Sequence, residues 1–150
     1  MIDAGASQRV AELMRETAAA ELLPRFRNLS KDDVRQKRPG DIVTVADEAA
    51  EQRLASGLAK ILPGVPVVGE EAVEKDPGLL DLIARPGEAC WIVDPLDGTS
   101  NFAAGRDRFA IIVCLVQDRR AIAGWILDVP RDRLAVAHRG GGVTFDGLPI

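Results

Sequence analysis

The sequence contains no tyrosine, one histidine and two cysteines among its 150 residues. The single histidine leaves His138 as the only base for a Ser-His-Asp triad, and we interpret it instead as a surface or packing residue at a strand end. Cys90 and Cys114 both lie in apolar, strand-like runs. We therefore expect two buried free thiols rather than a disulfide, in a reducing compartment.

Long apolar runs are also missing. No stretch reaches the ~18 residues of a membrane span, and the first residues lack the basic-then-apolar pattern of a signal peptide. We therefore expect no membrane partner and a cytoplasmic protein. The net charge of −4 argues against broad binding to a nucleic-acid polymer. An apolar content of 47% and a charged content of 28% are typical of a single soluble globular domain.

Apolar periodicity predicts two helices in the first part of the chain. The first covers residues 5–26 and the second covers residues 45–61. Thr44 is a suitable N-cap for the second helix, and Asp47 follows three positions later, as in a capping box. Residues 27–40 between the helices are polar and charged, which predicts a loop or a mobile arm.

The rest of the chain is dominated by strand patterns joined by short turns. Helices followed by successive hairpins predict an α+β fold, with two N-terminal helices on an antiparallel sheet and one domain over residues 1–150. Three consecutive glycines at 140–142 lack the Lys-Ser/Thr ending of a P-loop, so we interpret them as a bend in the sheet. The predicted elements are strands at 65–68, 90–94, 108–117, 121–128 and 133–138, and a short helix at 77–84.

The most informative segment is residues 91–102, WIVDPLDGTSNF. An apolar strand ends in Asp94, and Asp97 follows three positions later, just before a Gly-Thr-Ser turn. Mg²⁺ prefers oxygen ligands, and a turn rich in free N–H groups can hold a phosphate. Together these features predict metal-assisted phosphate chemistry. A type I′ hairpin at Asp97-Gly98 is the alternative, but residues 99–104 do not alternate as a returning strand should.

A second pair of carboxylates, Glu70 and Glu71, follows the short strand at 65–68. If the two strand ends converge, these residues share one small space with Asp94 and Asp97, which brings three or four carboxylates together. Their mutual repulsion is costly without a cation, and bound Mg²⁺ would remove that cost. The alternative is that Glu70 and Glu71 lie in a solvated turn.

Asp47 and Thr99 form another candidate pair. The simplest interpretation of Asp47 is the capping box with Thr44. The functional hypothesis is that the Asp47 carboxylate accepts a hydrogen bond from the Thr99 hydroxyl, which then orients an attacking water. The two roles are compatible, because a helix N-terminus stabilises an anion. Lys37 and Arg38 belong either to a solvated loop or to a device that guides an anionic substrate.

These motifs resemble those of the inositol monophosphatase family, which comprises Mg²⁺-dependent, Li⁺-sensitive sugar-phosphate phosphatases. The resemblance runs in order along nearly the whole chain, and its central motif with the upstream Glu-Glu pair is highly specific. The strongest matching segments are Lys37 with residues 41–47 (DIVTVAD), residues 69–71 (GEE) and residues 91–102; the weaker ones are residues 124–130, 137–142 and 146–147.

The resemblance implies a set of metal ligands. Glu70, Asp94 and the backbone carbonyl of Leu96 would bind a first Mg²⁺, and Asp94 and Asp97 would bind a second. Glu70 would help to hold a third ion where three are bound.

The resemblance also implies the catalytic and substrate-binding residues. Asp47 and Thr99, together with Glu70, would activate the attacking water, and the amides of Gly98, Thr99 and Ser100 would hold the phosphate. The implied fold is part of a layered α/β sandwich, and family members are often homodimers, so a homodimer is one expected state.

The implied activity is that of a phosphomonoesterase that hydrolyses a small phosphorylated polyol such as inositol-1-phosphate without a phosphoenzyme. Fructose-1,6-bisphosphate, histidinol phosphate and 3′-phosphoadenosine nucleotides stay open as substrates. Family members are longer than this chain, and their C-terminal half supplies a further Asp to the second metal site. We therefore expect a weakened second site and exposed apolar surface here. A truncated, non-catalytic metal-binding module is the rival interpretation.

Overall fold

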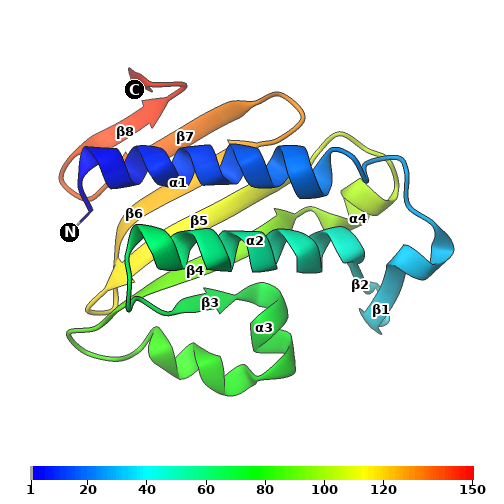
Figure 1. Cartoon of the computed structure of the whole chain (residues 1–150), viewed down its shortest axis with the longest axis horizontal. Coiled ribbons are helices and arrows are strands. Elements are labelled where there is room, and N and C mark those ends of the chain that lie inside the picture. Colours follow the sequence, from blue (N-terminus) through cyan, green and yellow to red (C-terminus); the bar gives the residue numbers. More distant parts are fainter. Residues whose placement is uncertain (1) are drawn as a thin grey trace.

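The computed structural model describes residues 2–150 and has two long helices on one face of a sheet (Figure 1). Helices α1 (Ala4–Thr17) and α2 (Val45–Ile61) lie side by side across this face. The strand order is β3-β4-β5-β6-β7-β8-β9; the first pair is parallel and the others are antiparallel. The predicted α+β fold is therefore confirmed, with one parallel strand added. The strands are β3 (Val67–Gly69), β4 (Ala89–Asp97), β5 (Ala110–Gln117), β6 (Arg120–Asp128), β7 (Arg133–His138), β8 (Gly142–Phe145) and β9 (Leu148–Pro149).

Helix α2 has the predicted bounds because strong local signals mark both of its ends. The Ala46 N–H donates to the Thr44 hydroxyl at 3.1 Å, and the Thr44 N–H donates to the Asp47 carboxylate at 2.9 Å, so the capping box is present. Pro63-Gly64 follows the last turn. The buried face of α2 consists of Ala46, Ala50, Leu54 and Leu58, all fully buried.

Helix α1 is shorter than the predicted helix over 5–26. It ends at Thr17, and a π-helical stretch, η1 (Ala18–Leu22), follows it directly before the chain turns. Pro24 has no N–H to donate, which stops any helical continuation at that point. The wider π turn still leaves Leu22 fully buried.

The prediction of a loop over 27–40 is wrong in its second half. After a short 3₁₀ turn, η2 (Lys31–Asp33), strand β1 (Val34–Arg38) pairs antiparallel with β2 (Asp41–Thr44). Gly40 allows the tight turn between the strands with a φ of +79°. The strand was hidden because a two-stranded hairpin has a largely exposed face, so its residues are polar.

The main core lies between the two helices and the sheet. Its centre is the pair Trp91 and Trp125, both fully buried, with ring centroids 5.9 Å apart. A smaller cluster on the other face of the sheet is covered by the 3₁₀ segment η3 (Pro77–Leu82), close to the short helix α3 (Glu70–Lys75). The smaller cluster is formed by Val68, Cys90 and Val116, with Val73, Leu79, Leu82, Ile83, Ile92 and Cys114 packed against it.

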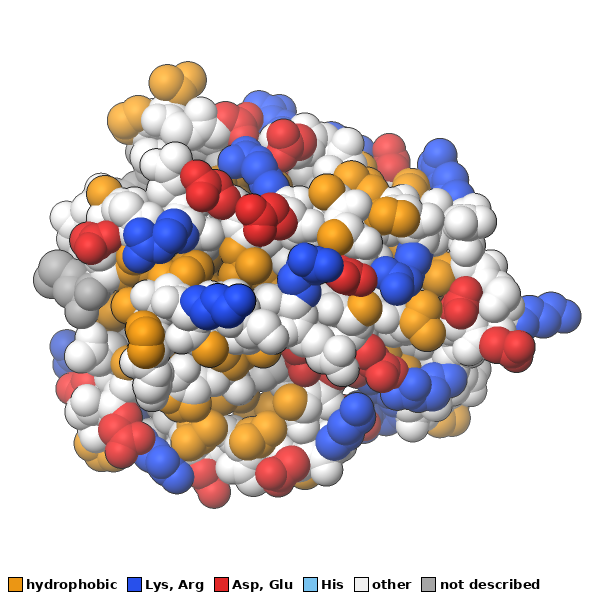
Figure 2. Space-filling view, viewed as in Figure 1, with side chains coloured by type: hydrophobic (Ala, Val, Ile, Leu, Met, Phe, Trp, Pro, Cys, Tyr) orange, Lys and Arg blue, Asp and Glu red, His pale blue; other side chains and the backbone are white. Residues whose placement is uncertain are grey.

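Beyond η3, that second face is open. Ile126 points away from its buried neighbours Trp125 and Leu127 and is 49% exposed. Other large apolar side chains with substantial exposure include Val143, Leu148 and Ile150. On the helix-covered face, acidic and basic side chains are interspersed with hydrophobic ones (Figure 2).

Two further observations concern the sequence predictions. Cys90 and Cys114 are both free; Cys90 is buried and Cys114 is half-buried. Within residues 2–150, no helix combines the length and the apolar content that crossing a bilayer requires.

Candidate metal and phosphate site

The starts of α2, α3 and α4 (Thr99–Ala103) gather at one end of the sheet (Figure 1). Strands β3 and β4 are parallel, so both run toward this end, and Gly69 of β3 pairs with Val93 of β4. Asp94 is the next residue on β4, and Glu70, the first residue of α3, follows β3. The parallel pairing therefore brings together two of the three or four carboxylates that the sequence predicted to share one small space.

Glu70 and Asp94 interact directly through their carboxyl groups. Partial burial of its carboxyl group, together with the contact to Asp94, raises the pKa of Glu70 to about 7, although the residue as a whole is exposed. Burial also raises the pKa of Asp94, while hydrogen bonds from Glu70 and from the Leu96 N–H oppose that rise. The two carboxyl groups therefore favour protonation of one of them while no cation is bound, because two neighbouring negative charges repel each other.

Asp97 lies at the edge of the same site. The pairing of β4 with β5 is irregular between Asp94 and Asp97, and the Leu96 N–H donates to Asp94 Oδ1 at 3.2 Å within this irregularity. Asp97 is exposed, and its negative charge adds to the rise in the pKa of Asp94. The carbonyl oxygen of Leu96 lies 3.0 Å from Thr99 Oγ1.

Asp47 caps helix α2 with one carboxylate oxygen and contacts Thr99 of the candidate site with the other. Its Oδ2 accepts from the N–H and the hydroxyl of Thr44, at 2.9 and 2.7 Å, while its Oδ1 lies 2.8 Å from Thr99 Oγ1. The capping box is therefore confirmed, and the other oxygen of Asp47 makes the predicted hydrogen bond with Thr99; that Thr99 orients an attacking water stays a prediction. Asp47 is buried, and that burial raises its pKa, although hydrogen bonds from Thr44 and Thr99 oppose the rise.

Gly98 connects β4 to α4. Its φ is +89°, and a Cβ at this position would lie 2.6 Å from the Arg108 carbonyl oxygen, so only glycine fits. Helix α4 begins at Thr99, which shows that the alternative of a hairpin at Asp97-Gly98 is wrong. The N–H groups of Thr99 and Ser100 lie in the first turn of α4, where backbone donors have no partner within the helix.

The solvated-turn interpretation of Glu70 and Glu71 is wrong, because both residues lie in the first turn of α3. Glu71 is buried, and Lys37 Nζ lies 2.9 Å from its Oε2. Burial raises the pKa of Glu71; for Lys37, burial acts downward, but pairing with Glu71 outweighs it and raises the pKa. Lys37 is thus a buried partner and not part of a solvated loop, whereas the exposed Arg38 pairs with Asp41 and Glu74.

Glu51 is a residue that the sequence predictions missed. Its carboxylate is buried against the start of α3, where it accepts from the N–H groups of Glu71 and Ala72 at 2.8 and 2.9 Å. The available signal was its position four residues after Asp47, which places both carboxylates on one face of α2.

The oxygen donors at this site suit a hard cation such as Mg²⁺. The donor set is nevertheless partial: among residues 2–150, no three His, Cys, Asp or Glu side chains converge tightly enough to form a metal site on their own. The structure brings Glu70 and Asp94 into contact and leaves Asp97 and Asp47 close enough to influence them by charge.

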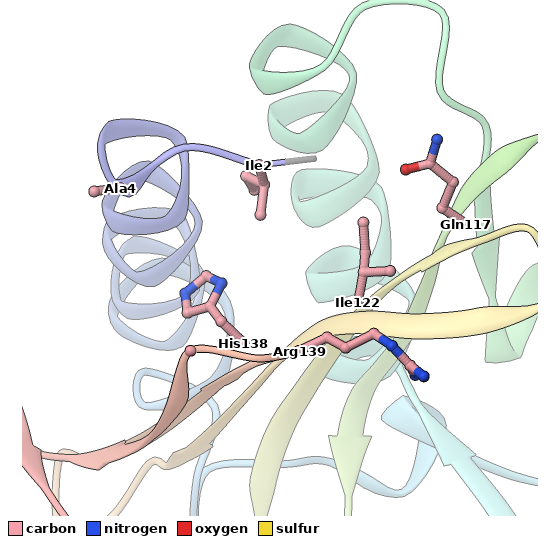
Figure 3. Close-up of a pocket in the computed structure, with 7 residues that line it drawn as sticks. Ile2, Ala4, Gln117, Ile122, His138 and Arg139 are labelled. Atoms are coloured by element: carbon pink, nitrogen blue, oxygen red, sulfur yellow. The ribbon is translucent and has the colours of Figure 1, made fainter.

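A separate cavity of about 400 Å³ lies at the start of α1, beside the ends of the sheet strands (Figure 3). His138 is one of its lining residues, with Nε2 3.0 Å from Ser7 Oγ and the ring edge-on to Trp125. This packing confirms the interpretation of His138 as a packing residue at a strand end. The cavity is lined by Ile2, Ala4, Gln117, Ile122, His138, Arg139 and Gly141, and it contains none of the acidic residues discussed above.

We compared the chain with known protein families, protein sequences and solved structures. The profile of the inositol monophosphatase family matches residues 3–150. The chain belongs to the inositol monophosphatase family. An inositol-1-monophosphatase of Mesorhizobium japonicum is 38% identical over 77% of this chain and 44% of its own length. A protein of Pseudomonas aeruginosa named Nus factor SuhB is 33% identical over 87% of this chain and 46% of its own length.

A solved structure of the family gives the same result for the fold. The extragenic suppressor protein SuhB of Bartonella henselae superposes with a TM-score of 0.80 at 28% identity, covering 97% of this chain and 53% of its own. The chain therefore spans about half the length of the family members that it matches. The family fold confirms the expected architecture as part of a layered α/β sandwich.

Proposed function

We propose that this inositol monophosphatase family chain forms the metal- and phosphate-binding part of a Mg²⁺-dependent phosphomonoesterase. Its substrate would be a small phosphorylated polyol such as inositol-1-phosphate. The observation that carries the proposal is the interaction of Glu70 with Asp94, where β3 ends beside β4. Two carboxylates in contact without a cation favour protonation of one of them, and a divalent ion can replace that proton.

Glu70, Asp94 and the Leu96 carbonyl would hold a first Mg²⁺, and Asp94 with Asp97 would hold a second; Glu70 would also help with a third. Bound Mg²⁺ would polarise a phosphoryl oxygen and stabilise the charge that develops on the leaving oxygen. The partial donor set in residues 2–150 means that the second ion, which has fewer ligands, would bind more weakly.

Thr99 and Asp47 would orient the attacking water. Because Asp47 Oδ1 accepts the Thr99 hydroxyl proton at 2.8 Å, a lone pair on Thr99 Oγ1 stays available to accept a hydrogen bond from water. Burial of Asp47 and its bonds to Thr44 fix this geometry. The N–H groups at Gly98, Thr99 and Ser100 would hold the phosphate.

The test is phosphate release from inositol-1-phosphate in the presence of Mg²⁺. We expect Asp94→Asn to abolish release, because it removes the carboxylate that both ions would share. Asp81→Asn, an exposed position on η3, is the matched control and should leave release unchanged. Equal activity in Asp94→Asn and in the unaltered protein would contradict the assigned site. A panel with fructose-1,6-bisphosphate, histidinol phosphate and a 3′-phosphoadenosine nucleotide would define the substrate.

A non-catalytic binding module is a second candidate, and the partial donor set favours it. Calorimetric titration with Mg²⁺, run beside the phosphate-release assay, separates the two. Binding without turnover would support the module. A cytoplasmic location and a homodimer stay expectations from the sequence.

A further inference from the structure

The start of α3 lacks a capping side chain of its own. Its N-cap residue is Gly69, which has no side chain to accept from the first free N–H groups of the helix. Glu51, from the middle of α2, fills this role across the fold. Its Oε1 accepts from the Glu71 N–H at 2.8 Å and its Oε2 accepts from the Ala72 N–H at 2.9 Å.

The Glu51 carboxylate lies so close to Gly69 that a side chain at position 69 would displace it. A Cβ on Gly69 would lie 2.3 Å from Glu51 Cδ and 2.5 to 2.6 Å from its two oxygens. The φ of Gly69 is −98°, which any residue can adopt. The glycine is therefore required by the space that the Glu51 carboxylate occupies and not by backbone strain.

The same short helix is held from a second side. Lys37 of β1 pairs with Glu71 at 2.9 Å, and both side chains are more than nine-tenths buried. Glu70 is the first residue of α3. The residue before it belongs to strand β3, which is paired with β4, and the backbone after it is held by the hydrogen bond to Glu51. Its direction toward Asp94 depends on the angle at which α3 leaves β3.

We propose that Glu51 is a positioning residue for the carboxylate pair: it fixes the start of α3 so that Glu70 faces Asp94. This inference rests on the proposed function, because it assigns to Glu51 an effect on Mg²⁺ binding although Glu51 is not itself a ligand. The absence of a side chain at Gly69 leaves the space that the Glu51 carboxylate needs for this role.

The first experiment compares Mg²⁺ binding by calorimetry in Glu51→Gln and Glu48→Gln. Gln at 51 keeps one carbonyl acceptor but turns an NH₂ group toward the other backbone N–H, which disturbs the cap. We expect Mg²⁺ association to weaken on the order of tenfold, as for other groups that orient a ligand without binding the metal. Glu48 lies on the same helix and is half-buried, and it pairs with the exposed Arg35 rather than with α3, so Glu48→Gln should bind Mg²⁺ as the unaltered chain does.

The second experiment needs no metal. Gly69→Ala is introduced into the unaltered chain and into Glu51→Ala, and the unfolding equilibrium of each protein is measured with a chelator present. With Glu51 in place, the added Cβ should raise the unfolding equilibrium constant by about tenfold or more. In the Glu51→Ala background the space is free, and the same substitution should change it by less than about threefold. Equal effects in the two backgrounds would overturn the inferred contact.

The outcomes separate the two proposals. If the unaltered chain takes up no Mg²⁺, the proposed function fails, and the assigned effect of Glu51 on binding fails with it. If the unaltered chain binds Mg²⁺ and Glu51→Gln binds it equally well, only the positioning role of Glu51 is overturned.

Discussion

At the scale of single residues, the Glu70 and Asp94 carboxyl groups determine how the site responds to pH. Glu70 has a pKa of about 7 in the folded chain, against an ordinary value of 4.5. Between these values the folded state binds more protons at Glu70 than the unfolded state does. The contribution of Glu70 to stability is therefore most favourable below the ordinary value, falls as pH rises toward 7, and is unfavourable above it.

Glu70→Gln should accordingly stabilise the metal-free chain at about pH 8, because it removes the repulsion with Asp94. We expect a gain on the order of 1 kcal/mol, after allowing for solvent screening of an exposed residue. Urea unfolding at several pH values measures this, with Glu12→Gln on exposed α1 surface as the control. A loss of stability at high pH in Glu70→Gln would show that the two carboxylates do not oppose each other.

At the scale of elements, one buried ion pair joins the β1–β2 hairpin to the rest of the site. The Lys37 and Glu71 side chains are only 8% and 7% exposed, whereas Arg35, on the same strand, is 62% exposed in its pair with Glu48. Removing one partner of a buried pair leaves an unpaired charge, which is far more costly than losing a surface pair.

Lys37→Met should therefore destabilise the chain by about 3–5 kcal/mol, and Arg35→Met by less than about 1 kcal/mol. Chemical denaturation of the two variants gives both values. Adding Glu71→Gln to Lys37→Met should recover part of the loss, because no charge is then left buried. Similar costs for Lys37→Met and Arg35→Met would mean that the hairpin is not attached through Glu71.

Helices and strands with strong local signals could be predicted from the sequence, whereas a strand that depends on its partner could not. Helix α2 was predicted to the residue because Thr44 and Asp47 mark its start and Pro63-Gly64 follows its end, all within the local sequence. Strand β1 was missed, because its polar residues carry no apolar alternation and its pairing depends on β2.

In the candidate site, features marked by the local sequence could be predicted, and those that depend on contacts between distant elements could not. The contact between Glu70 and Asp94 could be predicted because each follows an apolar run of strand residues, although β4 continues past Asp94 to Asp97. The role of Glu51 could not, since its two hydrogen bonds go to residues 20 and 21 positions away and depend on how α2 packs against α3. The assignment of metal ligands and phosphate donors came from the family resemblance and stays a proposal.

At the scale of the whole molecule, the two faces of the sheet differ. One face is covered by α1 and α2, and the other is covered by α3 and η3 over the β3–β5 side. Ile126 and Leu127 are neighbours on β6 that point to opposite faces; they are 49% and 1% exposed.

This difference predicts unequal costs for two matched substitutions. Leu127→Ala should destabilise the chain by about 2–5 kcal/mol, because it leaves a cavity in the core. Ile126→Ala should cost less than about 1 kcal/mol, since its side chain is half in solvent. Thermal or urea unfolding measures both. Equal costs, or a larger cost for Ile126→Ala, would show that the face assigned as open is covered.

The central claim is that the parallel pairing of β3 with β4 creates a cation site from Glu70 and Asp94. Calorimetric titration of the whole chain with Mg²⁺ at about pH 8, above the pKa of about 7 of Glu70, tests it most directly. We predict at least one binding event, weakened by about tenfold or more in Glu70→Gln and in Asp94→Asn. No Mg²⁺ uptake by the unaltered chain, or equal uptake by both variants, would contradict the claim.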